Sequence, residues 1–183
     1  MKNTTYKTAI FGGGCFWCTE AFFQEVKGVI NVTSGYSGGN SEEEPTYQAV
    51  SLGMTGHAEV VHITYNPEIV TYEELLVIFM ITHNPTLLNR QGADIGTQYH
   101  SVVFYETPRE KQIIDIVFKE LQPFFDKPIV TEVSPRKTFF KADEKHQDYY
   151  KNNPEYRYCT AVIEPKLSKF RKQYAEMLAQ KPA

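Results

Sequence analysis

Hydrophobic positions along this chain fall into short runs with two different periods. Alternating or continuous apolar runs predict β-strands at residues 6–11, 29–36, 57–65, 99–105, 129–133 and 158–163. Helical spacing or a helix-start signal predicts helices at residues 15–26, from Thr71, from Thr107, and at 165–180. This irregular alternation favours an α+β fold, a two-layer α/β sandwich of split βαβ units around a mixed sheet, with a ferredoxin-like core. We expect residues 1–183 to form a single domain, with the 165–180 helix packed on it.

Two of the predicted helices carry a recognisable start. Thr71 with Glu74, and Thr107 with Glu110, have the spacing of a capping box, in which the two side chains satisfy free N–H groups of the first turn. A long irregular stretch at residues 83–98 follows the first of these helices. Long ordered loops often carry function, so we expect site residues there.

Composition and charge exclude several classes of function. The net charge of −3 over 183 residues leaves no basic excess to bind nucleic acid. No apolar run approaches the roughly eighteen residues of a membrane span, and the first residues lack a signal-peptide pattern, so we expect a cytoplasmic protein. Three cysteines, an odd number, indicate reduced thiols rather than a disulfide framework. The five histidines lack the paired spacing of a zinc site, so we expect no bound metal.

The segment "GGGCFWC" points to a reactive thiol at Cys15. A strand, a glycine turn and a helix start place this cysteine at a helix N-terminus, where free N–H groups and the helix dipole stabilise a thiolate. Such positions lower a thiol pKa and turn cysteine into a nucleophile. The alternative is a small buried core residue.

Two further cysteines are candidates for a second role. Cys18 shares a predicted helix row with Phe22 and Val26, so it is either a core residue or a resolving thiol that condenses with oxidised Cys15. Cys159 lies in the predicted 158–163 strand and is either a strand residue or a second resolving candidate.

Glu59 is the carboxylate with the most informative position. In "HAEVVHITY" it shares a strand face with the apolar side chains of Val61, Ile63 and Tyr65. Burial on that face raises a carboxyl pKa, and a Glu tuned towards neutrality serves as a general acid. The alternative is a strand-end Glu that reaches solvent.

Five segments together resemble one known family: "GGGCFWCTEAFF", "GYSGG", "PTYQAVSLGMTGHAEVVHITYNP", "RQGADIGTQYHSVVFY" and "HQDYYKNNP". From about residue 8 to residue 160 the chain resembles the A-type peptide methionine sulfoxide reductases. The resemblance implies that the protein reduces the S epimer of methionine sulfoxide, free or in proteins, to methionine, and so repairs oxidative damage.

The resemblance also implies roles for individual residues. Cys15 would attack the sulfoxide sulfur, and Glu59 would protonate the oxygen. Phe16 and Trp17 match the aromatic residues that hold the substrate's methyl group. The polar residues of the family's site, two hydroxyl donors to the oxygen and one residue that shapes the site, are matched by Tyr47, Tyr99 and Asp94.

The product of this reaction is a sulfenic acid at Cys15, which a second thiol converts to a disulfide. The resemblance implies recycling by thioredoxin or another dithiol, with no bound cofactor, and we expect a monomer. The chain departs from the family where Cys18 replaces a frequent glycine, and where no glycine-rich tail follows Cys159. Proximity favours Cys18 as the resolving thiol and alignment favours Cys159, so both stay open.

Two other functions compete with this one. A thioredoxin-like disulfide oxidoreductase would use Cys15 and Cys18 as its dithiol, but it leaves Glu59 and the aromatic residues unexplained. A non-catalytic module that binds oxidised methionine would never release methionine.

Overall fold

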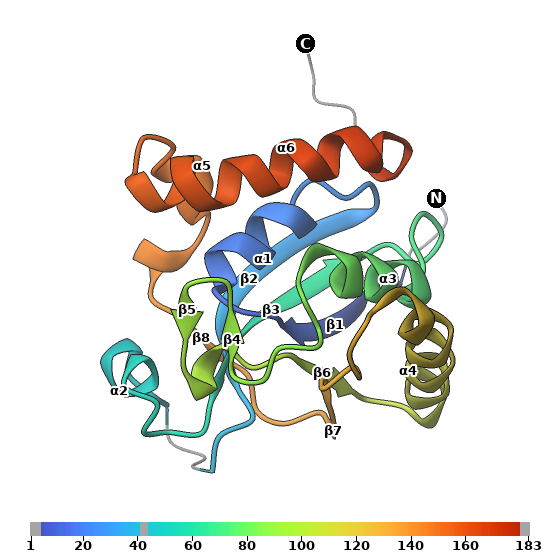
Figure 1. Cartoon of the computed structure of the whole chain (residues 1–183), viewed down its shortest axis with the longest axis horizontal. Helices are drawn as coiled ribbons and strands as arrows, with labels where there is room; N and C mark the ends of the chain where they lie inside the picture. Colours follow the sequence, from blue (N-terminus) through green and yellow to red (C-terminus); the bar gives the residue numbers. More distant parts are fainter. Residues whose placement is uncertain (1–4, 41–43, 180–183) are drawn as a thin grey trace.

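The computed structural model describes residues 5–40 and 44–179, which form a sheet covered by helices (Figure 1). The main sheet has six strands in the order β7-β6-β1-β3-β2-β8. Its strands are β1 (Lys7–Gly12), β2 (Val29–Ser37), β3 (Ala58–Tyr65), β6 (Val102–Tyr105), β7 (Glu132–Pro135) and β8 (Phe140–Lys141). The β6–β7 pair is parallel and the other pairs are antiparallel. The sheet is therefore mixed and the fold is α+β, as predicted.

The described part of the chain contains six α-helices that pack around this sheet. They are α1 (Phe16–Phe23), α2 (Tyr47–Ser51), α3 (Tyr72–Thr82), α4 (Pro108–Leu121), α5 (Tyr149–Asn152) and α6 (Glu164–Gln173). Both predicted capping boxes are present, at Thr71 before α3 and at Thr107 before α4. Between residues 5 and 179, leaving out 41–43, no helix is both long and apolar enough to cross a membrane.

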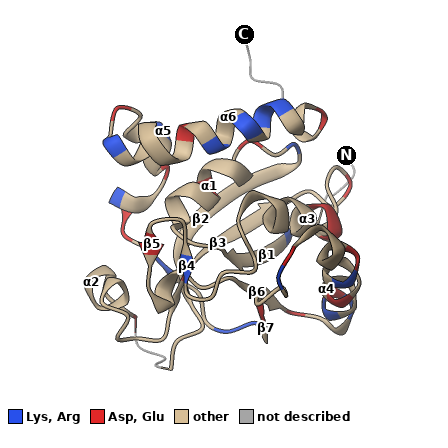
Figure 2. Ribbon diagram, in the orientation of Figure 1, with Lys and Arg blue, Asp and Glu red and all other residues tan. Residues whose placement is uncertain are grey.

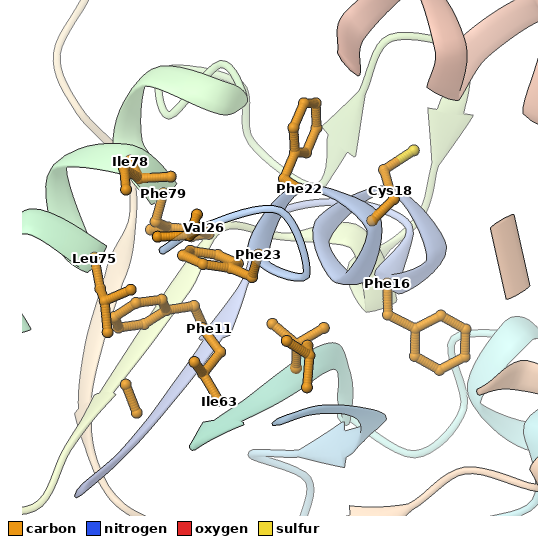
Figure 3. Close-up of a cluster of buried hydrophobic side chains, with 14 of the residues drawn as sticks. Phe11, Phe16, Cys18, Phe22, Phe23, Val26, Ile63, Leu75, Ile78 and Phe79 are labelled. Atoms are coloured by element: carbon orange, nitrogen blue, oxygen red, sulfur yellow. The ribbon is translucent and has the colours of Figure 1, made fainter. Parts of the chain in front are cut away.

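The core lies between the helices and one face of the sheet (Figure 3). Phe11 of β1 stacks on Phe79 of α3, with ring centroids 5.0 Å apart, and Ile63 of β3 joins the same cluster. The opposite face of the sheet carries a smaller cluster that includes Val60 and Phe104. The alternation predicted for β3 is therefore confirmed, because Val60 and Ile63 belong to different faces.

Several predicted elements differ from the structure. The predicted 99–105 strand begins only at Val102, after a 3-10 turn at Thr97–Tyr99, and the predicted 129–133 strand is shifted to Glu132–Pro135. Helix α1 ends at Phe23, not near Val26, because Val26 forms an isolated bridge with Leu178 instead. The predicted 158–163 strand is wrong, since Cys159–Ile163 is a π-helical turn that leads into α6. The closing helix stops at Gln173, with a 3-10 turn at Ala175–Met177, and residue 180 lies outside the described residues.

Candidate active site

A glycine turn positions Cys15 at the N-cap of α1, directly after β1. A Cβ atom on Gly13 would lie 2.8 Å from Cε2 of Phe79, closer than carbon atoms tolerate. Gly14 has a φ of +98°, which favours glycine over any other residue. The glycines therefore let the chain turn tightly against the core and deliver Cys15 at the helix start.

The prediction that the pKa of Cys15 is lowered is wrong for this structure. Cys15 is only 8% exposed, and burial raises the pKa of its thiol well above the ordinary value. The Cys18 thiol and the charge of Glu59 raise this pKa further, while the Trp17 N–H lowers it too weakly to offset them. The helix start that the sequence reveals is present, but desolvation outweighs it.

Glu59 lies beside Cys15 and is almost completely buried, at 2% exposure. Its Oε2 accepts the Phe16 backbone N–H at 3.0 Å, which ties the carboxyl to the peptide that follows Cys15. Burial raises the pKa of Glu59 to about 8, so the carboxyl is mainly protonated at neutral pH. A buried and mainly protonated carboxyl therefore lies next to the Cys15 peptide.

Tyr47 on α2 and Tyr99 in a 3-10 turn (Thr97–Tyr99) lie close to Cys15 and Glu59. Burial raises the pKa of both phenols, and the charges of Glu59 and Cys15 add to the rise in each. Both hydroxyls are thus protonated donors at neutral pH. Asp94 belongs to a hairpin formed by β4 (Arg90–Gln91) and β5 (Asp94–Ile95), and its charge contributes to the raised pKa of Glu59. The structure brings these sequence-predicted residues together.

Phe16 and Trp17 form part of an aromatic cluster next to the thiol. Phe16 is fully buried and Trp17 is half-buried. The Trp17 ring stacks flat on Tyr149, with centroids 3.7 Å apart and planes 5° apart. Its Nε1–H donates to Nδ1 of His146 at 3.3 Å, and the His146 ring in turn packs against Tyr47 at a tilt of 31°, with centroids 4.4 Å apart.

Cys18 lies one helical turn from Cys15 and is 7% exposed. It leaves α1 on the side opposite Phe16 (Figure 3). Interaction with the Cys15 thiol lowers the pKa of Cys18, and the charge of Lys166 on the basic helix α6 (Figure 2) also lowers it, against the effect of burial. Of the two thiols, Cys18 is thus the more readily ionised.

Cys159 is the least accessible thiol of the chain, with no exposed surface. Burial raises its pKa, and the charge of Cys18 adds to that effect. None of the three cysteines forms a disulfide. Cys18 interacts electrostatically with both Cys15 and Cys159.

Several residues near the site carried no sequence-based assignment. Tyr36 faces Glu59 across the β2–β3 ladder, and within the described chain its buried hydroxyl has no hydrogen-bond partner. Glu20, 1% exposed, accepts the backbone N–H groups of Asp148 at 3.0 Å and Tyr149 at 3.1 Å, and so fixes the segment that packs on Trp17. The motifs "GYSGG" and "HQDYY", which contain Tyr36 and Tyr149, were the sequence signals available for this part of the site.

In the described ranges 5–40 and 44–179, no group of three or more His, Cys, Asp or Glu side chains is placed to hold a metal ion. The site combines a thiol, a protonated carboxyl, phenol donors and the aromatic cluster of Phe16 and Trp17. Such a set can deliver a proton to an oxygen while sulfur attacks the atom bonded to it.

Comparison with known proteins gives matches along nearly the whole chain. Residues 7–178 match the family model described as Peptide methionine sulfoxide reductase. The peptide methionine sulfoxide reductase MsrA of Nitratiruptor sp. is 52% identical over 172 residues, covering 94% of this chain and 98% of that protein. The protein of the same name from Deinococcus radiodurans is 49% identical over 180 residues, covering 97% and 87%.

Solved structures also superpose on most of this chain. Reduced Mxr1 from Saccharomyces cerevisiae superposes with a TM-score of 0.77 at 32% identity, covering 86% of this chain and 94% of that one. Mxr1 in complex with Trx2 superposes with a TM-score of 0.56 at 23% identity, covering 81% and 87%.

Proposed function

Because the chain belongs to the peptide methionine sulfoxide reductase family, we propose that it reduces the S epimer of methionine sulfoxide, free or in proteins, by attack of the Cys15 sulfur. The observation that carries the proposal is the buried Glu59 carboxyl, hydrogen-bonded to the peptide next to Cys15. A sulfoxide oxygen leaves only when it is protonated, and this carboxyl holds a proton at neutral pH. The family membership decides against a thioredoxin-like disulfide oxidoreductase and a non-catalytic binding module.

In the first step the Cys15 sulfur attacks the sulfoxide sulfur. Cys18, the more acidic thiol, takes the proton of Cys15 as its thiolate, and Glu59 gives its proton to the substrate oxygen. The sulfur–oxygen bond of the substrate breaks, the oxygen passes to the Cys15 sulfur, and the transient bond between the two sulfur atoms breaks so that methionine leaves as the thioether. The oxygen ends on Cys15 as a sulfenic acid that carries the Glu59 proton, so the substrate sulfur is reduced and Cys15 is oxidised by two electrons.

The aromatic cluster and the two phenols orient the substrate. The half-buried Trp17 offers apolar surface to the methyl group of the substrate, and the buried Phe16 lies next to it. Tyr47 and Tyr99 are positioned near Glu59 and donate hydrogen bonds to the developing negative oxygen. Asp94 shapes the polar side of the site.

Cys18 is the thiol that resolves the sulfenic acid. It interacts with Cys15 directly, whereas Cys159 is sealed in the turn before α6. A disulfide between Cys15 and Cys18 forms as water leaves. A dithiol then reduces this disulfide by exchange, and thioredoxin, which Mxr1 binds in the yeast complex, is the partner we propose.

We also propose the type of core, the oligomeric state and the cellular location of the enzyme. The order β1-α1-β2-β3-α3-β6, with strands arranged β6-β1-β3-β2, supports a ferredoxin-like core. The shared core of α1, α3, α4 and α6 supports one catalytic unit, acting as a monomer. Three free thiols suit a reducing compartment, so we place the enzyme in the cytoplasm.

The test is a single turnover with each epimer of a peptide methionine sulfoxide. We expect the S epimer alone to yield methionine, and Cys15→Ser to abolish the product. Cys18→Ser should still form up to one equivalent of methionine but fail to turn over with thioredoxin. Cys159→Ser is the matched control and should turn over normally.

Mass spectrometry of the oxidised protein identifies the disulfide. A Cys15–Cys18 bond supports the proposal, and a Cys15–Cys159 bond refutes the assignment of Cys18. Absence of methionine from wild-type protein would refute the proposed activity itself.

A further inference from the structure

The Tyr158 hydroxyl lies between the second thiol and a carboxylate from a distant hairpin. It donates to Oδ2 of Asp94 at 2.6 Å and lies 3.6 Å from the Cys18 sulfur. The Tyr158 ring meets Trp17 edge-on, with centroids 5.8 Å apart, so its position is fixed from a third side. No sequence motif discussed above gave Tyr158 a role.

The Tyr158 hydroxyl has a single proton, and this decides which group donates in its contact with Cys18. A tyrosine hydroxyl has one proton and two lone pairs. Since that proton goes to Asp94, only a lone pair faces Cys18, and a protonated Cys18 must donate its S–H to Tyr158. The three groups therefore form a directed chain from sulfur through the phenol oxygen to the carboxylate.

We propose that Tyr158 relays the Cys18 proton to Asp94 when Cys18 attacks the sulfenic acid of Cys15. The inference rests on the proposed function, in which the first step leaves Cys18 protonated and a neutral thiol is a poor nucleophile. The proton must be removed where bulk water has little access, because Cys18 is 7% exposed.

The step balances as follows. The Cys18 S–H proton moves to the Tyr158 oxygen while the Tyr158 proton moves to Asp94, so Tyr158 ends neutral. The Cys18 sulfur bonds to the Cys15 sulfur, the bond between Cys15 and its oxygen breaks, and the departing hydroxide takes a proton from solvent to leave as water. Asp94, half-exposed, returns its proton to solvent. Cys18 is oxidised and the sulfenic sulfur is reduced.

Other titratable groups also face Cys18 and bear on any pH profile. They come from the α1 N-cap, the turn before α6, α6 itself and β5, and are Cys15, Tyr158, Cys159, Lys166 and Asp94. Lys166 favours the thiolate by its charge but accepts no proton from a thiol while it is an ammonium ion.

The experiment separates the two chemical steps in Tyr158→Phe. Reduced protein is mixed with one equivalent of peptide methionine sulfoxide and quenched at intervals. Methionine is measured by chromatography, and the sulfenic acid is trapped with a 1,3-diketone and counted by mass spectrometry against the Cys15–Cys18 disulfide. We expect methionine formation within about twofold of wild type, but disulfide formation slower by about 10²-fold, the scale of a lost acid–base group.

A purely structural role would not depend on pH. In the relay, the deficit of Tyr158→Phe shrinks as pH rises, because a larger fraction of Cys18 is already ionised and needs no relay. Tyr156→Phe is the matched control, since Tyr156 lies in the same segment and is 53% exposed, and it should form the disulfide at the wild-type rate.

A second variant distinguishes relay from mere positioning. Asp94→Asn keeps an oxygen that accepts the Tyr158 hydrogen bond but cannot take a proton, so we expect slow disulfide formation there too. A wild-type rate of disulfide formation in Tyr158→Phe or in Asp94→Asn overturns the relay. That failure is distinct from failure of the proposed function, which appears as no methionine or as a disulfide to Cys159.

Discussion

Replacing Glu59 by Gln tests the proton donor directly. Its carboxyl is 2% exposed, and burial raises its pKa to about 8. A carboxyl with this pKa is about nine-tenths protonated at pH 7 and about one-tenth protonated at pH 9. The wild-type rate of methionine formation should therefore fall about tenfold between these two pH values.

The Glu59→Gln variant has no proton to give at any pH. We expect its rate at pH 7 to be lower by about 10²-fold, with no decline towards pH 9. The gap to wild type should narrow to about tenfold at pH 9, because the wild-type acid is itself mostly ionised there. Quenched single-turnover measurements between pH 7 and pH 9, which isolate the first step, provide the rates.

Glu73→Gln, on the exposed first turn of α3, is the matched control and should keep the wild-type decline. A wild-type rate that stays constant from pH 7 to pH 9 contradicts an acid with a pKa near 8. A Glu59→Gln variant that declines like wild type shows that another group sets the profile. Either result removes Glu59 from the mechanism.

Three further outcomes can be measured on single variants. Gly13→Ala pushes a methyl group against Phe79, so the free energy of unfolding in urea should fall by about 1–3 kcal/mol. Tyr149→Ala removes the flat stack on Trp17, worth about 1 kcal/mol, and should raise KM more than it lowers kcat. Glu20 has a pKa raised to about 7 by burial, above its unfolded value, so its contribution to stability is lost as pH rises from about 4.5 to 7. Thermal unfolding should accordingly show Glu20→Gln gaining about 2 kcal/mol relative to wild type between pH 5 and pH 8, and an unchanged difference would contradict the raised pKa.

In the C-terminal segment, a strand-like sequence pattern concealed a helical turn. Residues 158–163 alternate like a strand, yet Cys159 and Ile163 are buried on one side of a helical turn and continue as Leu167 and Phe170 of α6. The spacing of four, four and three residues was the helical signal, and it became visible only across the predicted boundary. The capping boxes at Thr71 and Thr107 were found because all their atoms lie within one turn.

The sequence predicted which residues lie together at the proposed site but not their electrostatics. The motifs identified Cys15 and Glu59, and the strand face of Glu59 correctly implied burial. The same reasoning gave Cys15 a lowered pKa, because a helix start is local whereas desolvation depends on every element that covers the thiol. The contact between Cys18 and Tyr158 joins residues from opposite ends of the chain, and no local pattern encodes it.

The stack of Trp17 on Tyr149 has a practical consequence. The chain contains a single tryptophan, and it lies beside the reacting thiol. Its emission comes from this one indole, so oxidation of Cys15, release of product and arrival of the reductant all alter the surroundings of the same fluorophore. The enzyme thus carries its own optical probe, and its redox cycle can be followed in real time without any label.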